Sequence, residues 1–148
     1  MALRNTDLMV GDWVNLKNGK VIMPCRITVI GHATQDRNEI GTTVCVDLSK
    51  EFPTCIFDMD VITPIPLTPE ILEKNGFEIV YDEYKLPNYR IKKDIYTDFY
   101  FTVFTGVDGY WNPVGFGVMI GGVPATLDYV HQLQHALKLC KIEKTIEL

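Results

Sequence analysis

The sequence predicts an α+β protein: a β-rich N-terminal unit, built as a small SH3-like barrel or a β-meander, then an antiparallel sheet covered by a C-terminal helix. Residues 9–63 contain short β-branched runs separated by turn signals. Two prolines within 64–66 favour an extended connector, and residues 126–141 place apolar side chains at helical spacing. We therefore expect two units, 1–66 and 67–148, with packing into one compact domain as the alternative.

The first unit is expected to contain four or five short strands. Asn18-Gly19 is a strong signal for a two-residue hairpin, because both positions tolerate a positive φ. The next run, 20–30, is rich in β-branched residues, and Pro24 within it predicts an edge position or a bulge. The polar stretch 31–41 is predicted to be a loop. Further strands are expected at 42–48, 54–57 and 61–62.

A short helix is predicted directly after the joint. Thr68 can cap the free amides at its start, and Pro69 suits the first helical position. Gly76 can supply the left-handed residue that ends it, and Phe77 is then expected to fold back on Leu72 in a Schellman ending.

The rest of the second unit is predicted to return to strand before the final helix. Asp108-Gly109 indicates a hairpin turn. Gly121-Gly122 with Pro124 is expected to end the sheet, and residues 145–148 are a candidate for a last edge strand. The expected strands are 77–81, 89–92, 95–104, 110–111 and 114–120.

Composition is that of an ordinary globular protein. Of 148 residues, 47% are hydrophobic and 22% are charged, and the net charge is −5. When the chain is divided after Thr68, both halves carry more acidic than basic residues, which disfavours nucleic acid as a partner. The sequence has neither a signal-peptide pattern nor an apolar run long enough to span a membrane. We expect a cytoplasmic protein that does not contact a membrane.

The four cysteines predict neither a metal site nor a disulfide framework. Cys25, Cys45, Cys55 and Cys140 show no CxxC spacing, and the first three lie in strand-like runs. A free thiol in such a run behaves as a small hydrophobic side chain. We expect reduced thiols and no cofactor.

The predicted final helix carries the constellation of most chemical interest. Val130, Leu133, Leu137 and Cys140 form its apolar stripe, and the polar residues are expected to lie on the opposite side. These polar residues are Asp128, His131, Gln132, His135 and Lys138.

Two histidines one helical turn apart can share a metal ion. His131 and His135 have this spacing, and Asp128 is a candidate third ligand. However, the sequence between the histidines lacks the glutamate of an HExxH motif. A solvated or partner-facing polar stripe is therefore the favoured interpretation.

Basic and aromatic residues alternate in one other place. Arg90, Lys92 and Lys93 are flanked by Tyr84, Tyr96 and Tyr100, a combination that a single-stranded nucleic-acid platform needs. Acidic residues surround the run, so the charged solvent face of a strand is the favoured interpretation. With the helix stripe, this gives the candidate binding surface: Arg90, Lys92, Lys93, His131, Gln132 and His135.

Signals for catalysis or phosphate binding are weak. Ser49 is the one serine, and no GxSxG motif surrounds it. The glycines at 115, 117, 121 and 122 lie along a predicted strand, where they indicate bulges or close packing of an aromatic ring on backbone.

Two motifs support a family resemblance. Residues 64–77 read PIPLTPEILEKNGF and residues 129–134 read YVHQLQ. With the Gly-Asp-Trp-Val opening at 11–14, they resemble a group of small uncharacterised proteins from bacterial genomes, prophages and mobile elements, with a "PIPLTxExLxxxGF" joint and a C-terminal "YxHxLQ" helix. The resemblance implies a bacterial or phage-derived cytoplasmic protein without an assigned activity.

Three functional hypotheses follow. The leading one is a non-enzymatic interaction or accessory protein that binds a protein partner or a second copy of itself. The second is a nucleic-acid-associated small-barrel protein that uses the Arg90–Lys93 run. The third is a metal-dependent enzyme centred on His131 and His135.

Overall fold

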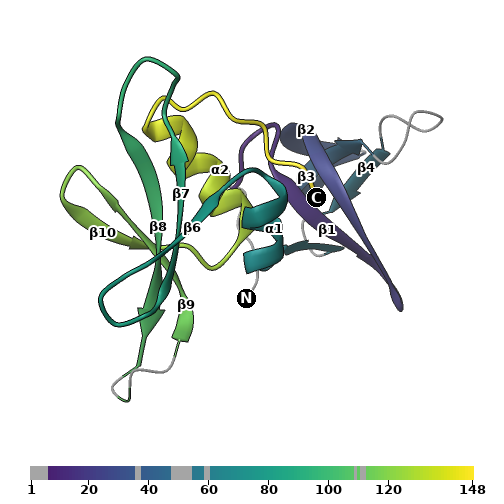
Figure 1. Ribbon diagram of the computed structural model, residues 1–148. Helices are drawn as coiled ribbons and strands as arrows, with labels where there is room; N and C mark the ends of the chain where they lie inside the picture. The colour runs from purple at the N-terminus through teal and green to yellow at the C-terminus, as the bar shows by residue number, and fades with distance from the viewer. Residues whose placement is uncertain (1–6, 36–37, 48–54, 59–60, 109, 111–112) are drawn as a thin grey trace. The chain divides into compact units, whose positions relative to one another are not determined.

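The computed structural model is an α+β structure that divides into two compact units, Met1–Ile65 and Pro66–Leu148 (Figure 1). It describes residues 7–35, 38–47, 55–58, 61–108, 110 and 113–148, with backbone alone at 18, 29, 31–35, 38–47, 55–58 and 113. Ser49 lies outside the described residues, as do the side chains of Cys45 and Cys55. The predicted fold class, α+β with antiparallel sheets and a C-terminal helix, is confirmed.

The first unit is a five-stranded antiparallel sheet. Its strands are β1 (Trp13–Asn18), β2 (Val21–Gln35), β3 (Asn38–Asp47), β4 (Cys55–Asp58) and β5 (Ile62–Pro64). Their order is β4-β3-β2-β1-β5, so four strands form a meander and the fifth returns beside the first. In the described pairings β4 and β5 are the two edges of an open sheet.

The β1–β2 hairpin is confirmed, with its turn one residue later than predicted. Asn18 pairs with Val21, which leaves Gly19 and Lys20 as the two turn residues. Pro24 lies opposite Asn15, ahead of the point at which β3 begins to pair with β2. Within the described pairings, in which β2 and β3 pair from Arg26 onward, Pro24 therefore has a partner on β1 alone.

The predicted loop at 31–41 is wrong, because strand continues through most of it. β2 extends to Gln35 and β3 begins at Asn38, with Gly31 opposite Thr43 and Thr34 opposite Glu39. The polar side chains of this stretch hide the hydrophobic alternation by which a strand is recognised in a sequence. The backbone hydrogen bonds between paired strands do not require that alternation.

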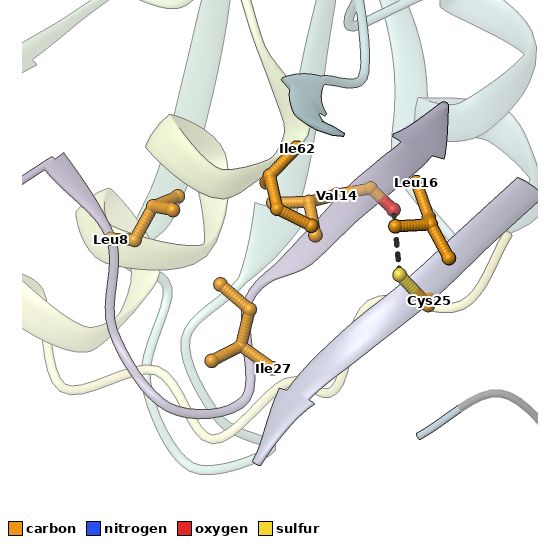
Figure 2. Close-up of a cluster of buried hydrophobic side chains, with 6 residues drawn as sticks. All are labelled: Leu8, Val14, Leu16, Cys25, Ile27 and Ile62. Atoms are coloured by element: carbon orange, nitrogen blue, oxygen red, sulfur yellow. Dashed lines mark hydrogen bonds between the residues drawn. The ribbon is translucent and has the colours of Figure 1, made fainter. Parts of the chain in front are cut away.

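The core of the first unit follows from period-two alternation on β1 and β2 (Figure 2). Val14 and Leu16 on β1 face the same side as Cys25 and Ile27 on β2. The Cys25 thiol donates a hydrogen bond to the Val14 carbonyl oxygen at 3.7 Å. The buried residues of this cluster are Leu8, Val14, Leu16, Cys25, Ile27 and Ile62.

The second unit opens with α1 (Pro69–Lys74), whose predicted ends are confirmed. The Thr68 hydroxyl accepts a hydrogen bond from the Ile71 N–H at 3.3 Å. At the other end Gly76 has φ +84°, and the Phe77 N–H donates to the Leu72 carbonyl at 3.1 Å. This is the hydrogen bond that defines a Schellman ending.

A five-stranded antiparallel meander follows, in the order β10-β9-β8-β7-β6. The prediction that Gly121 and Gly122 end the sheet is wrong. Both have positive φ and form a two-residue hairpin turn, after which residues 123–126 pair with β9. The strands are β6 (Glu78–Tyr81), β7 (Pro87–Lys92), β8 (Tyr100–Val107), β9 (Pro113–Ile120) and β10 (Val123–Thr126).

The connection between β8 and β9 is longer than the predicted two-residue turn. Val107 pairs with Pro113, so the connection spans residues 108–112, of which 109, 111 and 112 lie outside the described residues. Between Thr105 and Val107 the register shifts by one residue, which places a bulge in β9 beside Gly115. The interpretation of the glycine run as a strand with a bulge is therefore confirmed at Gly115 and Gly117, whereas Gly121 and Gly122 form a turn.

The final helix, α2 (Val130–Leu139), is shorter than the predicted 126–141 at both ends, and residue 126 belongs to β10. Its start is capped by the Gln132 side-chain oxygen, which accepts hydrogen bonds from the backbone N–H groups of Asp128 (2.8 Å) and Tyr129 (3.1 Å). Figure 1 shows α2 alongside the sheet of the same unit. Buried residues of both elements form the core: Tyr89, Phe101, Val103, Val118, Val130, Leu133, Ala136 and Leu137.

The predicted strand at 145–148 is wrong, because this segment pairs with a side chain. The buried Asn75 amide donates to the Glu147 carbonyl at 2.7 Å and accepts from the Glu147 N–H at the same distance. The Lys74 ammonium donates to the Leu148 carbonyl oxygen. One asparagine therefore supplies both hydrogen bonds that a neighbouring strand would have supplied.

Candidate binding face of the second unit

The prediction that His131 faces away from the helix core is wrong. Its side chain is 2% exposed. The Tyr129 ring, which precedes the helix, lies parallel to the His131 ring with a centroid distance of 5.8 Å, and the His135 ring contacts it edge-on at 5.7 Å. The Tyr129 side chain, which comes before the helix, thus covers His131 on a side of the first turn that would be exposed in an isolated helix.

The predicted metal ligands do not come together as a site. Asp128 lies before the helix, is exposed, and uses its backbone carbonyl to accept from the Leu67 N–H at 2.9 Å. Within the described part of the chain, no three His, Cys, Asp or Glu residues are grouped so that they could hold a metal ion. Gln132 is engaged as the helix cap, and His135 is half-buried in the ring stack.

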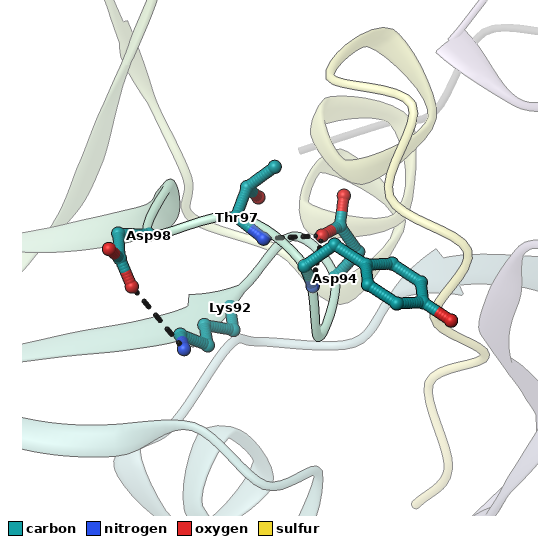
Figure 3. A network of polar contacts seen from close by, with 5 residues as sticks. Lys92, Asp94, Thr97 and Asp98 are labelled. Carbon is teal, nitrogen blue, oxygen red and sulfur yellow. Dashed lines mark hydrogen bonds and ion pairs between the residues drawn. The ribbon is translucent and has the colours of Figure 1, made fainter.

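The candidate basic residues on β7 are paired with carboxylates. Arg90 Nε lies 2.9 Å from Glu78 Oε2, and the Arg90 guanidinium carbon lies 4.2 Å from the centre of the Tyr100 ring. Lys92 Nζ lies 3.6 Å from Asp98 Oδ1 (Figure 3). Because each positive charge is paired with a carboxylate, Arg90 and Lys92 offer little net positive charge to attract a nucleic-acid phosphate backbone.

The loop that follows β7 is held by local hydrogen bonds. The Lys93 N–H donates to the Phe99 carbonyl at 2.9 Å. Asp94 Oδ1 accepts from the N–H groups of Tyr96 and Thr97, each at 2.8 Å (Figure 3). The hydrogen bond from Tyr96 is the main cause that lowers the pKa of the Asp94 carboxyl below its usual value.

The sheet has one buried face and one face that we call the outer face. Because Phe101 and Val103 are buried and side chains alternate, Tyr100, Thr102 and Phe104 lie on the outer face of β8. Phe104 pairs with Gly117, which places Met119 on the same face of β9, and Met119 pairs with Pro124 on β10.

The outer face is apolar at its β8–β10 end. Phe104 is 44% exposed and Met119 is 51% exposed. Two adjoining hollows, of about 330 and 320 Å³, are both lined by Phe104, Gly117, Pro124 and Ala125, and no charged residue lines either. We call Phe104, Gly117, Met119, Pro124 and Ala125 the apolar patch.

A third pocket, of about 270 Å³, lies where β8 and β9 separate. Residues 100–103 of β8 pair with β7, whereas residues 104–107 pair with β9. Residues 117–120 of β9 pair with β10, so the described pairings contain none between the first half of β8 and the last half of β9. The pocket is lined by Lys93, Phe99, Tyr100, Phe101, Thr102, Phe104, Val118, Met119, Cys140 and Ile142.

The sequence interpretation missed the apolar patch. Its signal was present in the alternation around Phe104, but the strand was predicted at 95–104 and ended at this residue. Met119 became relevant only through the register that joins β8, β9 and β10.

Over the described residues, neither helix combines the length and apolar character that a membrane crossing requires. No protein family, no curated protein and no solved structure matches this chain.

Proposed function

We propose that this chain is a non-enzymatic interaction or accessory protein that associates with a second copy of itself through the apolar patch. The observation that carries the proposal is the joint exposure of Phe104 and Met119 on neighbouring strands, beside hollows without a charged lining. Contiguous exposed apolar surface of this kind is typical of protein interaction sites.

The shape of the patch favours a second copy. The partly exposed Phe104 ring lies beside hollows that are also lined by Gly117, Pro124 and Ala125. The same surface therefore offers both a side chain that can insert and a hollow that can receive one. A two-fold symmetric interface requires this, because each copy must offer both. The absence of charge matters as well, since two chains of net charge −5 can meet there without bringing like charges into contact.

Pairing along the sheet edges is disfavoured. β10 is one edge, and Pro124 within it lacks a backbone N–H. β6 is the other edge, and its Glu78 side chain is 62% exposed. Proline and exposed charge are the usual protection of an edge strand, which leaves the face as the surface for association.

The test is the oligomeric state measured by sedimentation and light scattering. We expect the native chain of 16.9 kDa to dimerise with increasing concentration, and the double variant Phe104→Ser/Met119→Ser to stay monomeric. Leu139→Ser is the matched control, because Leu139 on α2 is 69% exposed and lies outside the patch. A native chain that stays monomeric up to about 0.5 mM, well above the micromolar range of weak dimers, contradicts the proposal.

For the first unit, we propose closure into the small SH3-like barrel. The order β4-β3-β2-β1-β5 supports it, because β4 and β5 are the edges that closure would join. Cross-strand nuclear Overhauser contacts between β4 and β5 are the expected signature. From the resemblance alone, we further propose a bacterial or phage origin and a cytoplasmic location.

A further inference from the structure

We propose that the pocket between β8 and β9 binds a small amphiphilic monoanion, an apolar chain or ring that carries one carboxylate. This goes beyond self-association: the pocket shares Phe104 and Met119 with the apolar patch, but its charged residue, Lys93, lies outside the patch. The argument rests on the composition of the pocket, its single charge, the surroundings of that charge and its volume.

The walls are aromatic and aliphatic. Phe99, Tyr100 and Phe101 come from the start of β8 and the residue before it, and Val118 and Met119 come from β9. Cys140 and Ile142, which follow α2, complete the lining. Most of the lining is therefore suited to an apolar ligand, as in small-molecule sites generally.

One charged residue lines the pocket, and it is Lys93. Asp98 lies 3.6 Å from Lys92, and Asp94 accepts from two backbone N–H groups and has only a weaker Coulomb interaction with Lys93 (Figure 3). No carboxylate is among the lining residues. A ligand with one negative charge therefore matches the pocket, whereas a cation or a multiply charged phosphate does not.

The volume sets the size of the ligand. The pocket holds about 270 Å³. At the liquid-water share of about 30 Å³ per non-hydrogen atom, this corresponds to roughly nine such atoms. Octanoate is close to this size and combines an apolar chain with one carboxylate, so we use it as the probe.

The first experiment is calorimetric titration with three probes. Octanoate is expected to bind. Octan-1-ol, which has the same chain without the charge, is expected to bind about tenfold more weakly, and acetate, which lacks the chain, is expected not to bind. Equal binding of octanoate and octan-1-ol, or no heat with octanoate at about 10 mM, contradicts the proposal.

Two variants test the assignment. Lys93→Gln is expected to weaken octanoate binding about tenfold and to leave octan-1-ol binding unchanged. Lys138→Gln is the matched control, since Lys138 is an exposed lysine on α2 outside the pocket. Unchanged octanoate affinity in Lys93→Gln overturns the role of this lysine.

A second readout locates the ligand. The half-buried Cys140 thiol lines the pocket, so saturating octanoate is expected to slow its alkylation at least fivefold. Alkylation of Cys140 at the same rate with and without octanoate, while calorimetry detects binding, places the ligand elsewhere and overturns the site. Because Phe104 and Met119 line both the pocket and the apolar patch, the sedimentation of the octanoate complex is measured as well. Octanoate binding by a chain that stays monomeric would show that the pocket does not depend on self-association.

Discussion

The burial and the hydrogen bonds of single residues in this protein depend on neighbours that a sequence pattern does not reveal. His131 is the clearest case, because helical periodicity places it on the polar stripe of α2 although it is 2% exposed. The Tyr129 and His135 rings pack against it. Asn75 is similar: it is the residue that follows a short helix, yet its side-chain amide forms two hydrogen bonds with the backbone of Glu147.

At this scale we predict that two thiols, those of Cys25 and Cys140, differ in their rate of reaction with a thiol reagent. Burial raises the pKa of the Cys25 thiol from 9.0 to about 11, whereas Cys140 is half-buried. In a Cys45→Ser/Cys55→Ser background at about pH 8, a thiol reagent should modify Cys140 well before Cys25, because the thiolate is the nucleophile. Mass spectrometry of the modified peptides measures the order of modification.

The same shift predicts the sign of a stability change. The unfolded Cys25 thiol ionises near 9.0, below its folded pKa of about 11, so unfolding releases a proton between these values. The free energy of unfolding should therefore fall as pH rises from 9.0 toward 11, and less steeply in Cys25→Ala than in the native background. Identical pH dependence in the two proteins would contradict the assignment.

Secondary-structure elements with local signals were predictable, and those that depend on a neighbour were not. α1 has its cap, its proline and its terminal glycine within one short run, and each has the expected role. β10 was missed because Pro124 and the two preceding glycines were interpreted as a break. A proline is compatible with an edge strand, and two glycines with a hairpin turn, once β9 is present to pair with them.

At this scale the ends of α1 provide a prediction. Thr68→Ala should destabilise the second unit by about 1 kcal/mol, because the Ile71 N–H loses its acceptor. Gly76→Ala should cost a further 1–2 kcal/mol, roughly the strain of a left-handed φ on a residue with a Cβ. Urea unfolding followed by circular dichroism measures both, with the exposed helix residue Glu70→Ala as the control.

A smaller effect of Gly76→Ala than of the Glu70 control would show that the helix end is not fixed as described. An unchanged midpoint in Thr68→Ala would show that water replaces the hydroxyl cap at no cost.

At the scale of the whole molecule, the chain consists of two units that each have their own sheet and buried residues. The first unit has the cluster around Val14 and Ile27, and the second has the cluster around Val103 and Leu133. The apolar patch and the pocket between β8 and β9 both belong to the second unit. Both proposed activities are therefore properties of residues 66–148.

We accordingly predict that a fragment of residues 66–148 folds alone. Its sheet, both helices and their hydrogen bonds lie within this range. A dispersed amide spectrum and a cooperative thermal transition are expected, with the concentration-dependent dimerisation of the full chain retained. A collapsed spectrum without a cooperative transition would show that the second unit depends on the first.

The sequence by itself determined the α+β class, the position of α1, and the presence of hairpins between β1 and β2 and between β8 and β9, because these depend on residues close together in the chain. It did not determine the position of the first turn or the length of the second connection. Only the tertiary structure decided that His131 is buried, that Asn75 binds the C-terminal segment, and that Phe104 shares a surface with Met119. The reason is physical: capping and turn chemistry act over a few residues, whereas burial and strand register bring together residues that are distant in the chain.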